Sequence, residues 1–148
     1  MLIKELKTIF RRDLLKVRSE IESYKNESVI WHYEKGISNS GGNLCLHLVG
    51  NLNAYIGIGL AKTNYVRARD LEFSLKNIPR KKLLTMLDDT ITIVESGLDT
   101  LSDKQLEDPF PIKIWENDTS IGYTLIHLAA HLNYHLGQIN YHRRLLDI

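Results

Sequence analysis

Cysteine, proline and long apolar runs are scarce in this sequence, and each scarcity excludes a class of protein. The chain of 148 residues contains 1 cysteine, Cys45, so no intramolecular disulfide can form and a reducing compartment is expected. It contains 3 prolines and 9 glycines, fewer turn residues than an all-β domain of this length usually needs. No run of about 18 apolar residues occurs, so we expect no membrane span.

An excess of charge of one sign is also lacking. The sequence has 19 basic and 18 acidic residues, which gives a formal net charge of +1. A chain so close to neutrality has no global field that would attract nucleic acid or an acidic membrane, and we expect neither as a partner. Residues 1–12 alternate apolar and basic side chains, unlike the apolar stretch of a signal peptide. A cytoplasmic location follows by default.

The sequence does show a clear helical periodicity. Apolar residues recur at steps of three and four in four segments, approximately residues 2–24, 42–63, 79–101 and 120–146, and this spacing indicates amphipathic helices. Pro79 suits the first turn of the third helix, and Asp118, Thr119 and Ser120 can each cap the fourth. Four helices of about 20 residues are sufficient for a bundle. We therefore predict an all-α fold, with residues 1–148 forming a single four-helix-bundle domain.

Three glycines lie inside the second predicted helix: Gly50, Gly57 and Gly59. Each costs about 1 kcal/mol of helix stability relative to alanine. Their presence indicates either that another backbone or a ligand comes close to this helix, or that the helices pack tightly there.

Four of the six histidines lie along one line of the last predicted helix. At 100° per residue, His127, His135, Gln138 and His142 all fall within about 40° of His131. The row borders the leucine-rich stripe that faces the core, where an unpaired polar group costs roughly 1–3 kcal/mol. His131 and His135 are spaced i and i+4, so they could hold one divalent ion such as zinc, nickel or copper.

A third ligand would have to come from another helix, and His47 is the best candidate. It lies in the stretch 46–52, a segment otherwise suited to burial, with Asn43 and Asn51 one turn to either side. These two amides could orient the imidazole by hydrogen bonds. The residues alone leave open the alternative of a core histidine that is bonded to an asparagine or to a backbone carbonyl.

Two polar residues flank the predicted histidine pair. Gln138 lies one turn beyond His135, where it could orient that ligand, contact a substrate or form an ordinary buried amide bond. His127 lies one turn before His131, where it could line the substrate pocket or form an alternative pair with His131.

The polar connection over residues 64–77 contains Arg67, Arg69, Asp70 and Glu72. We expect the two acids to pair with the two arginines. No carboxylate in the sequence is placed well enough to be named as a general base, so the catalytic residues stay unassigned.

The pattern His131-x-x-x-His135-x-Gly137-Gln138, together with one histidine in the second helix, resembles the DinB-like superfamily over nearly the whole chain. Residues 46–52 and 67–73 are similar to the corresponding stretches of its small bacterial members of unknown function. The resemblance implies an up-down-down-up bundle with a long crossover between the second and third helices. It also implies a three-histidine metal site formed by His47, His131 and His135, most often with zinc or nickel.

The superfamily includes S-transferases that use low-molecular-weight bacterial thiols such as bacillithiol and mycothiol. Three protein ligands leave one position of a tetrahedral metal open, which is the pattern of a catalytic site. We therefore expect a divalent-metal-dependent enzyme that transfers a small thiol to an electrophilic small molecule. The alternatives are a metal-dependent hydrolase and a non-catalytic bundle that binds a small ligand or a partner through structural histidines. A homodimer is expected by analogy with related bundles.

Overall fold

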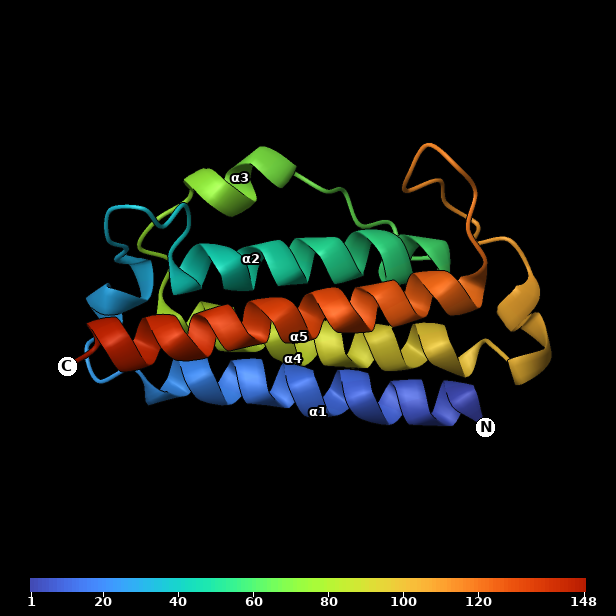
Figure 1. Ribbon diagram of the computed structural model, residues 1–148, viewed down its shortest axis with the longest axis horizontal. Helices are drawn as coiled ribbons and strands as arrows, with labels where there is room; N and C mark the ends of the chain where they lie inside the picture. Colours follow the sequence, from blue (N-terminus) through green and yellow to red (C-terminus); the bar gives the residue numbers. More distant parts are fainter.

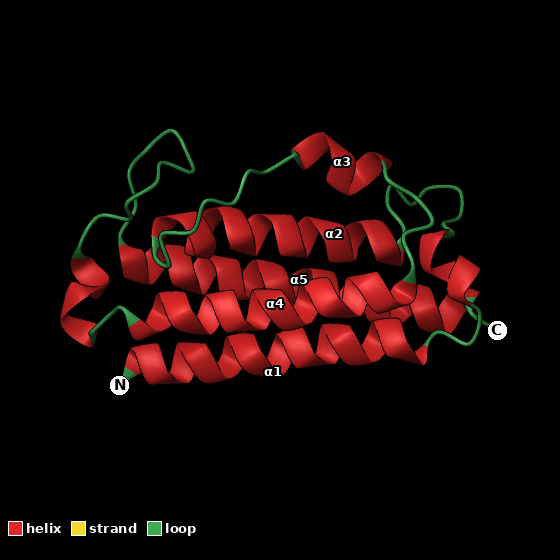
Figure 2. Cartoon of the chain, turned by 180° about the vertical axis from the view of Figure 1, so that it is seen from behind, coloured by secondary structure: helices red, strands yellow, loops and turns green.

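The computed structural model describes residues 1–148 and is built from helices, without a β-strand (Figure 2). Four long helices lie side by side: α1 (Leu2–Ser23), α2 (Gly41–Leu52), α4 (Arg80–Asp99) and α5 (Ile121–Leu146) (Figure 1). Shorter pieces connect them, namely α3 (Arg69–Ser74) and the 3₁₀ helices Glu27–Trp31 and Asp103–Glu107. The predicted all-α class is confirmed. None of the helices combines the length and the apolar character that spanning a bilayer requires.

A single cluster of 28 buried apolar residues, drawn from all four long helices, forms the core. The helix ends follow their capping residues. Of the three candidate caps before the last helix, Ser120 takes the role, and its hydroxyl accepts a hydrogen bond from the backbone N–H of Tyr123. The hydroxyl of Ser40 caps α2 in the same way, by accepting from the N–H of Asn43. These bonds satisfy donors that a helix N-terminus would otherwise leave unpaired.

The chain crosses over the outside of the bundle between α2 and α4. In Figure 1, α1 and α5 run in one direction and α2 and α4 in the other, so α2 and α4 are parallel. The connection between them must therefore return along the length of α2, and α3 lies on this path, over α2 (Figure 1). Lys62 and Asn77 near its two ends both have positive φ angles, of 56° and 58°.

Helix α3 lies within the segment that was expected to be a polar connection, so that expectation is corrected. Its six residues are too few to show an apolar period. Its one buried side chain is that of Glu72, so the residue that faces the bundle is a carboxylate. Hydrophobic patterning could not indicate such a helix.

The second predicted helix also departs from its expected form. Regular α-helix ends at Leu52, and the chain continues as a π-helical segment, Asn53–Ile58. In an α-helix, residues four apart drift by about 40° per step around the axis. The wider π turn offsets this drift, and Tyr55 consequently lines the same pocket as His47 and Asn51.

Candidate metal centre

Three histidines from two adjacent helices converge on one point. The Nε2 atom of His131 on α5 lies 3.2 Å from Nε2 of His47 on α2 and 3.1 Å from Nε2 of His135 on α5. One ligand nitrogen from each ring lies within 4.8 Å of the others. His47 is buried and the other two are half-buried. The three predicted ligands thus lie close together and could hold a metal ion.

The far nitrogens of two of these rings have oxygen partners. Nδ1 of His47 lies 3.0 Å from Oε1 of Glu72, and Nδ1 of His135 lies 2.7 Å from Oε1 of Gln138. Carboxylate and amide oxygens only accept hydrogen bonds, so each Nδ1 carries the proton and each Nε2 keeps its lone pair. This is the arrangement that metal-binding histidines usually have.

The third ring, that of His131, cannot satisfy both neighbours. Its Nε2 can carry a single proton, which leaves one of the facing lone pairs without a full hydrogen bond, and its Nδ1 is buried without a partner. A cation between the rings would satisfy all three Nε2 atoms at once. Three neutral imidazole nitrogens are a donor set that suits zinc or nickel.

Burial favours the neutral form of His47 and His131, which is the form that a metal ligand must have. The pKa of His131 is lowered to about 4, first by burial and then by the neighbouring His135 and His47. The pKa of His47 is also lowered, chiefly by burial, although the hydrogen bond with Glu72 opposes the shift. His131 is therefore uncharged at neutral pH and can offer a lone pair to a metal.

Glu72 on α3 supports the site from outside the two helices that carry the histidines. Its carboxylate also accepts two hydrogen bonds from Arg67, one from Nε at 2.9 Å and one from a terminal nitrogen at 3.0 Å. Of the two acid–arginine pairs expected in this segment, Glu72 with Arg67 is present, whereas Asp70 forms no ion pair. Sequence reasoning missed that the same carboxylate reaches His47. Arg69 stacks over the ring of Phe73 at 5.6 Å and makes no ion pair with an acid.

Gly50 makes room for that carboxylate. A Cβ atom at this position would collide with Oε2 of Glu72 and would lie 2.5 Å from its Cδ. The Cβ positions of Gly57 and Gly59 instead face side chains of the bundle, such as Ile93 and Phe110, at 3.3 Å. The alternative of tight packing therefore holds at Gly57 and Gly59, whereas the close neighbour of Gly50 is a side-chain carboxylate and not the backbone or ligand that was expected.

The two predicted amides near His47 do not bond to its ring. The Nδ2 group of Asn43 donates to the backbone carbonyls of Glu72 and Leu75, both at 2.9 Å, so it fastens α3 onto α2. Asn51 is 7% exposed and its Oδ1 has no partner. It lines a pocket beside His47.

The other two predicted residues both lie on α5. Gln138 bonds to His135, as described above. His127 is exposed and lies beside Trp115, with ring centroids 4.7 Å apart. Trp115 comes from the loop before α5, whose two ends are joined by a hydrogen bond of 2.8 Å from the Phe110 N–H to the Thr119 carbonyl.

A pocket of ≈160 Å³ opens beside the histidines. Its walls come from α2, the π-helical segment, the crossover, the loop before α5 and α5 itself. They are formed by His47, Asn51, Tyr55, Arg67, Arg69, Ile114, Trp115, His127, Leu128 and His131. Sequence reasoning did not place Tyr55 or Trp115 here, because neither belongs to the histidine pattern. The arrangement can hold a metal with a small ligand beside it.

No curated protein matches the chain. A family model described as "Protein of unknown function (DUF1572)" matches residues 2–147. The match spans every residue of the histidine cluster and its supporting side chains. The chain therefore belongs to the DUF1572 family of proteins of unknown function.

Proposed function

We propose that the protein is a divalent-metal-dependent enzyme of the DinB-like type that transfers a low-molecular-weight thiol to an electrophilic small molecule. The observation that carries the proposal is the convergence of three Nε2 atoms, two of them presented by rings whose Nδ1 atoms are held by Glu72 and Gln138. The direction of the long helices and the crossover between α2 and α4 support the DinB-like type.

His47, His131 and His135 would hold a zinc or nickel ion, which would supply Lewis-acid activation of a small thiol as its thiolate. In the transfer itself, the thiolate sulfur forms a bond to the electrophilic carbon. The leaving group departs with the electron pair of the bond that breaks, and the thiol proton passes to solvent. The side chains of His47 and His135 are held in fixed orientations by Glu72 and Gln138, which preorganises the site.

A hydrolase would use the same open position for water. A non-catalytic bundle would instead keep a hydrogen bond from Nε2 of His131 to one of its neighbours. The first alternative differs from the proposal in its products. The second differs in the metal content of the protein.

The first test is metal content by mass spectrometry of tag-free protein, with His131→Ala and His135→Ala as variants. His142→Ala is a matched control, because His142 is also half-buried on α5 but lies outside the cluster. We expect about one ion per chain in the wild type and in the control, and none in the two ligand variants. A wild type that takes up no zinc or nickel on reconstitution would contradict the proposal.

Activity is then measured with a panel of small thiols and a chromogenic electrophile. We expect a thioether product that depends on the metal and disappears in His131→Ala. Hydrolysis of the electrophile without sulfur transfer would favour the hydrolase.

A further inference from the structure

We propose that Arg69 forms an anion-binding subsite in the pocket beside the histidines, so that the small molecule bound there carries a carboxylate or a similar anionic group. The inference rests on the proposed function for the thiol end of that ligand. The anionic end rests on the pocket alone.

The pocket has a positive wall that lacks a counter-charge. Two arginines, Arg67 and Arg69, and no carboxylate are among the residues that line it. The charge of Arg67 is balanced by its two hydrogen bonds to Glu72. Arg69 makes neither an ion pair nor a hydrogen bond within the chain, so its guanidinium is free to bind an anion in bidentate fashion.

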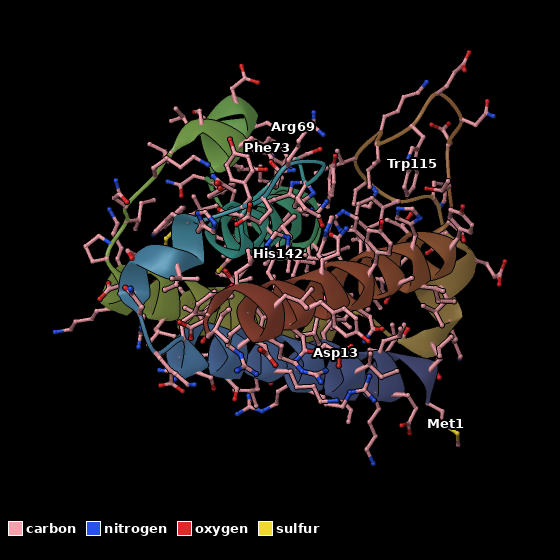
Figure 3. All side chains as sticks on the ribbon, turned by 60° about the vertical axis from the view of Figure 1, so that its left-hand side comes forward. Met1, Asp13, Arg69, Phe73, Trp115 and His142 are labelled. Carbon is pink, nitrogen blue, oxygen red and sulfur yellow. The ribbon has the colours of Figure 1, made fainter.

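Arg69 is exposed, and one contact orients its side chain. It lies on α3, and its guanidinium stacks over the ring of Phe73 at 5.6 Å. Figure 3 shows Arg69 and Trp115 on the same side of the bundle, one from α3 and the other from the loop before α5. Both line the pocket that contains His47 and His131. A ligand in this pocket can therefore touch the histidine end and Arg69 together.

Asn51 gives a second, independent indication of a ligand. Its side chain is 7% exposed, lines the pocket, and has an amide oxygen without a hydrogen-bond partner. A buried polar group left unpaired costs free energy, so a ligand group that donates a hydrogen bond to this oxygen would satisfy it.

The pocket is partly open to solvent, and its size limits the enclosed part of the ligand to a short group. At about 30 Å³ for each water-sized unit, a volume of ≈160 Å³ corresponds to about five such units. Two acids, Glu116 and Asp118, line a separate and more open hollow that shares Trp115 and His127 with this pocket. The negative charge of the ligand therefore belongs at the Arg69 end.

The test compares 3-mercaptopropionate with its neutral isostere 3-mercaptopropionamide by calorimetric titration, with zinc-loaded and metal-free protein. A parallel titration of cobalt-loaded protein follows the absorption band of a thiolate bound to the metal. The variant is Arg69→Gln. The control is Arg144→Gln, an exposed arginine that also stacks on an aromatic ring, that of Tyr141 at 5.5 Å.

We expect the wild type to bind the carboxylate about tenfold more tightly than the amide, the ratio that one charge-assisted bond typically supplies. Arg69→Gln should remove the preference, because it lowers the affinity for the carboxylate and not for the amide. Arg144→Gln should leave the preference unchanged. Equal affinities of the wild type for the carboxylate and the amide would overturn the subsite. The same loss of preference in Arg144→Gln as in Arg69→Gln would also overturn it.

Failure of the proposed function has a different signature. If neither thiol alters the cobalt spectrum, or no metal binds, thiol ligation is wrong. The subsite still predicts that metal-free protein prefers the carboxylate over the amide and that Arg69→Gln removes this preference. If metal-free protein shows no such preference, the subsite is wrong as well.

Discussion

The carboxylate of Glu72 is shared between a histidine and an arginine, and it is the only carboxylate bonded to the histidine cluster. Its negative charge raises the basicity of the His47 ring and fixes which nitrogen faces the other rings. At the same time, Arg67 offsets the cost of burying that charge. The site therefore depends on a residue that lies outside the helices that carry its ligands.

Replacement of Glu72 by glutamine tests this dependence. Glu72→Gln keeps the shape and an oxygen for the His47 Nδ1–H but removes the charge, so we expect zinc affinity to fall by about 10- to 100-fold. Zinc competition against a chelator measures the change. Glu20→Gln is the control, because Glu20 is a partly buried carboxylate that pairs with Arg143 on α5, outside the cluster. Equal zinc affinity in the two variants would contradict the role of Glu72.

At the scale of the elements, the contact between α2 and α3 depends on the missing side chain of Gly50. The backbone of α2 comes so close to Glu72 that any Cβ at residue 50 must displace the carboxylate. The hydrogen bonds from Asn43 to two carbonyls of the crossover hold α3 at this distance. The positions of α3 and of the charge behind His47 are therefore coupled.

Gly50→Ala should accordingly lower the free energy of unfolding by about 1–3 kcal/mol, a typical cost of overpacking, and should weaken zinc binding. Urea denaturation followed by circular dichroism gives the first quantity. Gly137→Ala, in the middle of α5, should instead raise the free energy of unfolding, because nothing lies within 4 Å of its Cβ position. The gain there should be up to about 1 kcal/mol from helix propensity. A Gly50→Ala protein as stable as the wild type would show that the carboxylate has room to move.

The elements that sequence could predict are those with a repeating apolar face. Buried residues of α1 such as Leu6, Phe10 and Leu14 recur at steps of four, and the long helices followed from such patterns. Helix α3 presents Glu72 to the bundle, so it had no apolar period to detect. At the π turn after Leu52, the Asn53 side chain donates to the Val49 carbonyl and to the Thr90 hydroxyl on α4. The second contact spans 37 residues, so a local pattern could not indicate it.

The same distinction separates the site residues. His131 and His135 were predictable as a pair because they share one helix. His47 was a candidate because it lies in a mostly apolar stretch, and the resemblance to the DinB-like superfamily made it the expected third ligand. The role of Glu72 was not predictable, because its contact with His47 spans 25 residues and depends on how the crossover folds back over α2. A local pattern carries no information about such a contact.

For the molecule as a whole, burial of histidines links stability to pH. The pKa values of His47, His131 and His142 are all lowered, with burial the largest cause in each case. In the unfolded chain the same groups titrate near their ordinary value of 6.5. Below that value the unfolded chain binds more protons than the folded one, so the free energy of unfolding falls as the pH falls.

We therefore expect metal-free protein to lose stability steadily between pH 6.5 and pH 4, the interval set by His131. Urea denaturation at a series of pH values, with a chelator present, measures the slope. His131→Gln and His142→Gln should each reduce that slope, since each removes one group that the unfolded chain protonates first. Parallel curves for the wild type and both variants would mean that other groups govern the acid response.

The crossover between α2 and α4 has a consequence for how this architecture could change over evolutionary time. Two parallel neighbouring helices cannot be joined by a short turn, so the topology requires a connecting segment of some length. Here that segment carries Arg67, Arg69 and Glu72, while the three histidines belong to the helices of the bundle. The histidines and the arginine of the proposed anion-binding subsite thus lie in separate parts of the chain. An exchange of the connecting segment would therefore change the pocket wall at Arg69, and it would keep the support of His47 only where a carboxylate is retained at position 72.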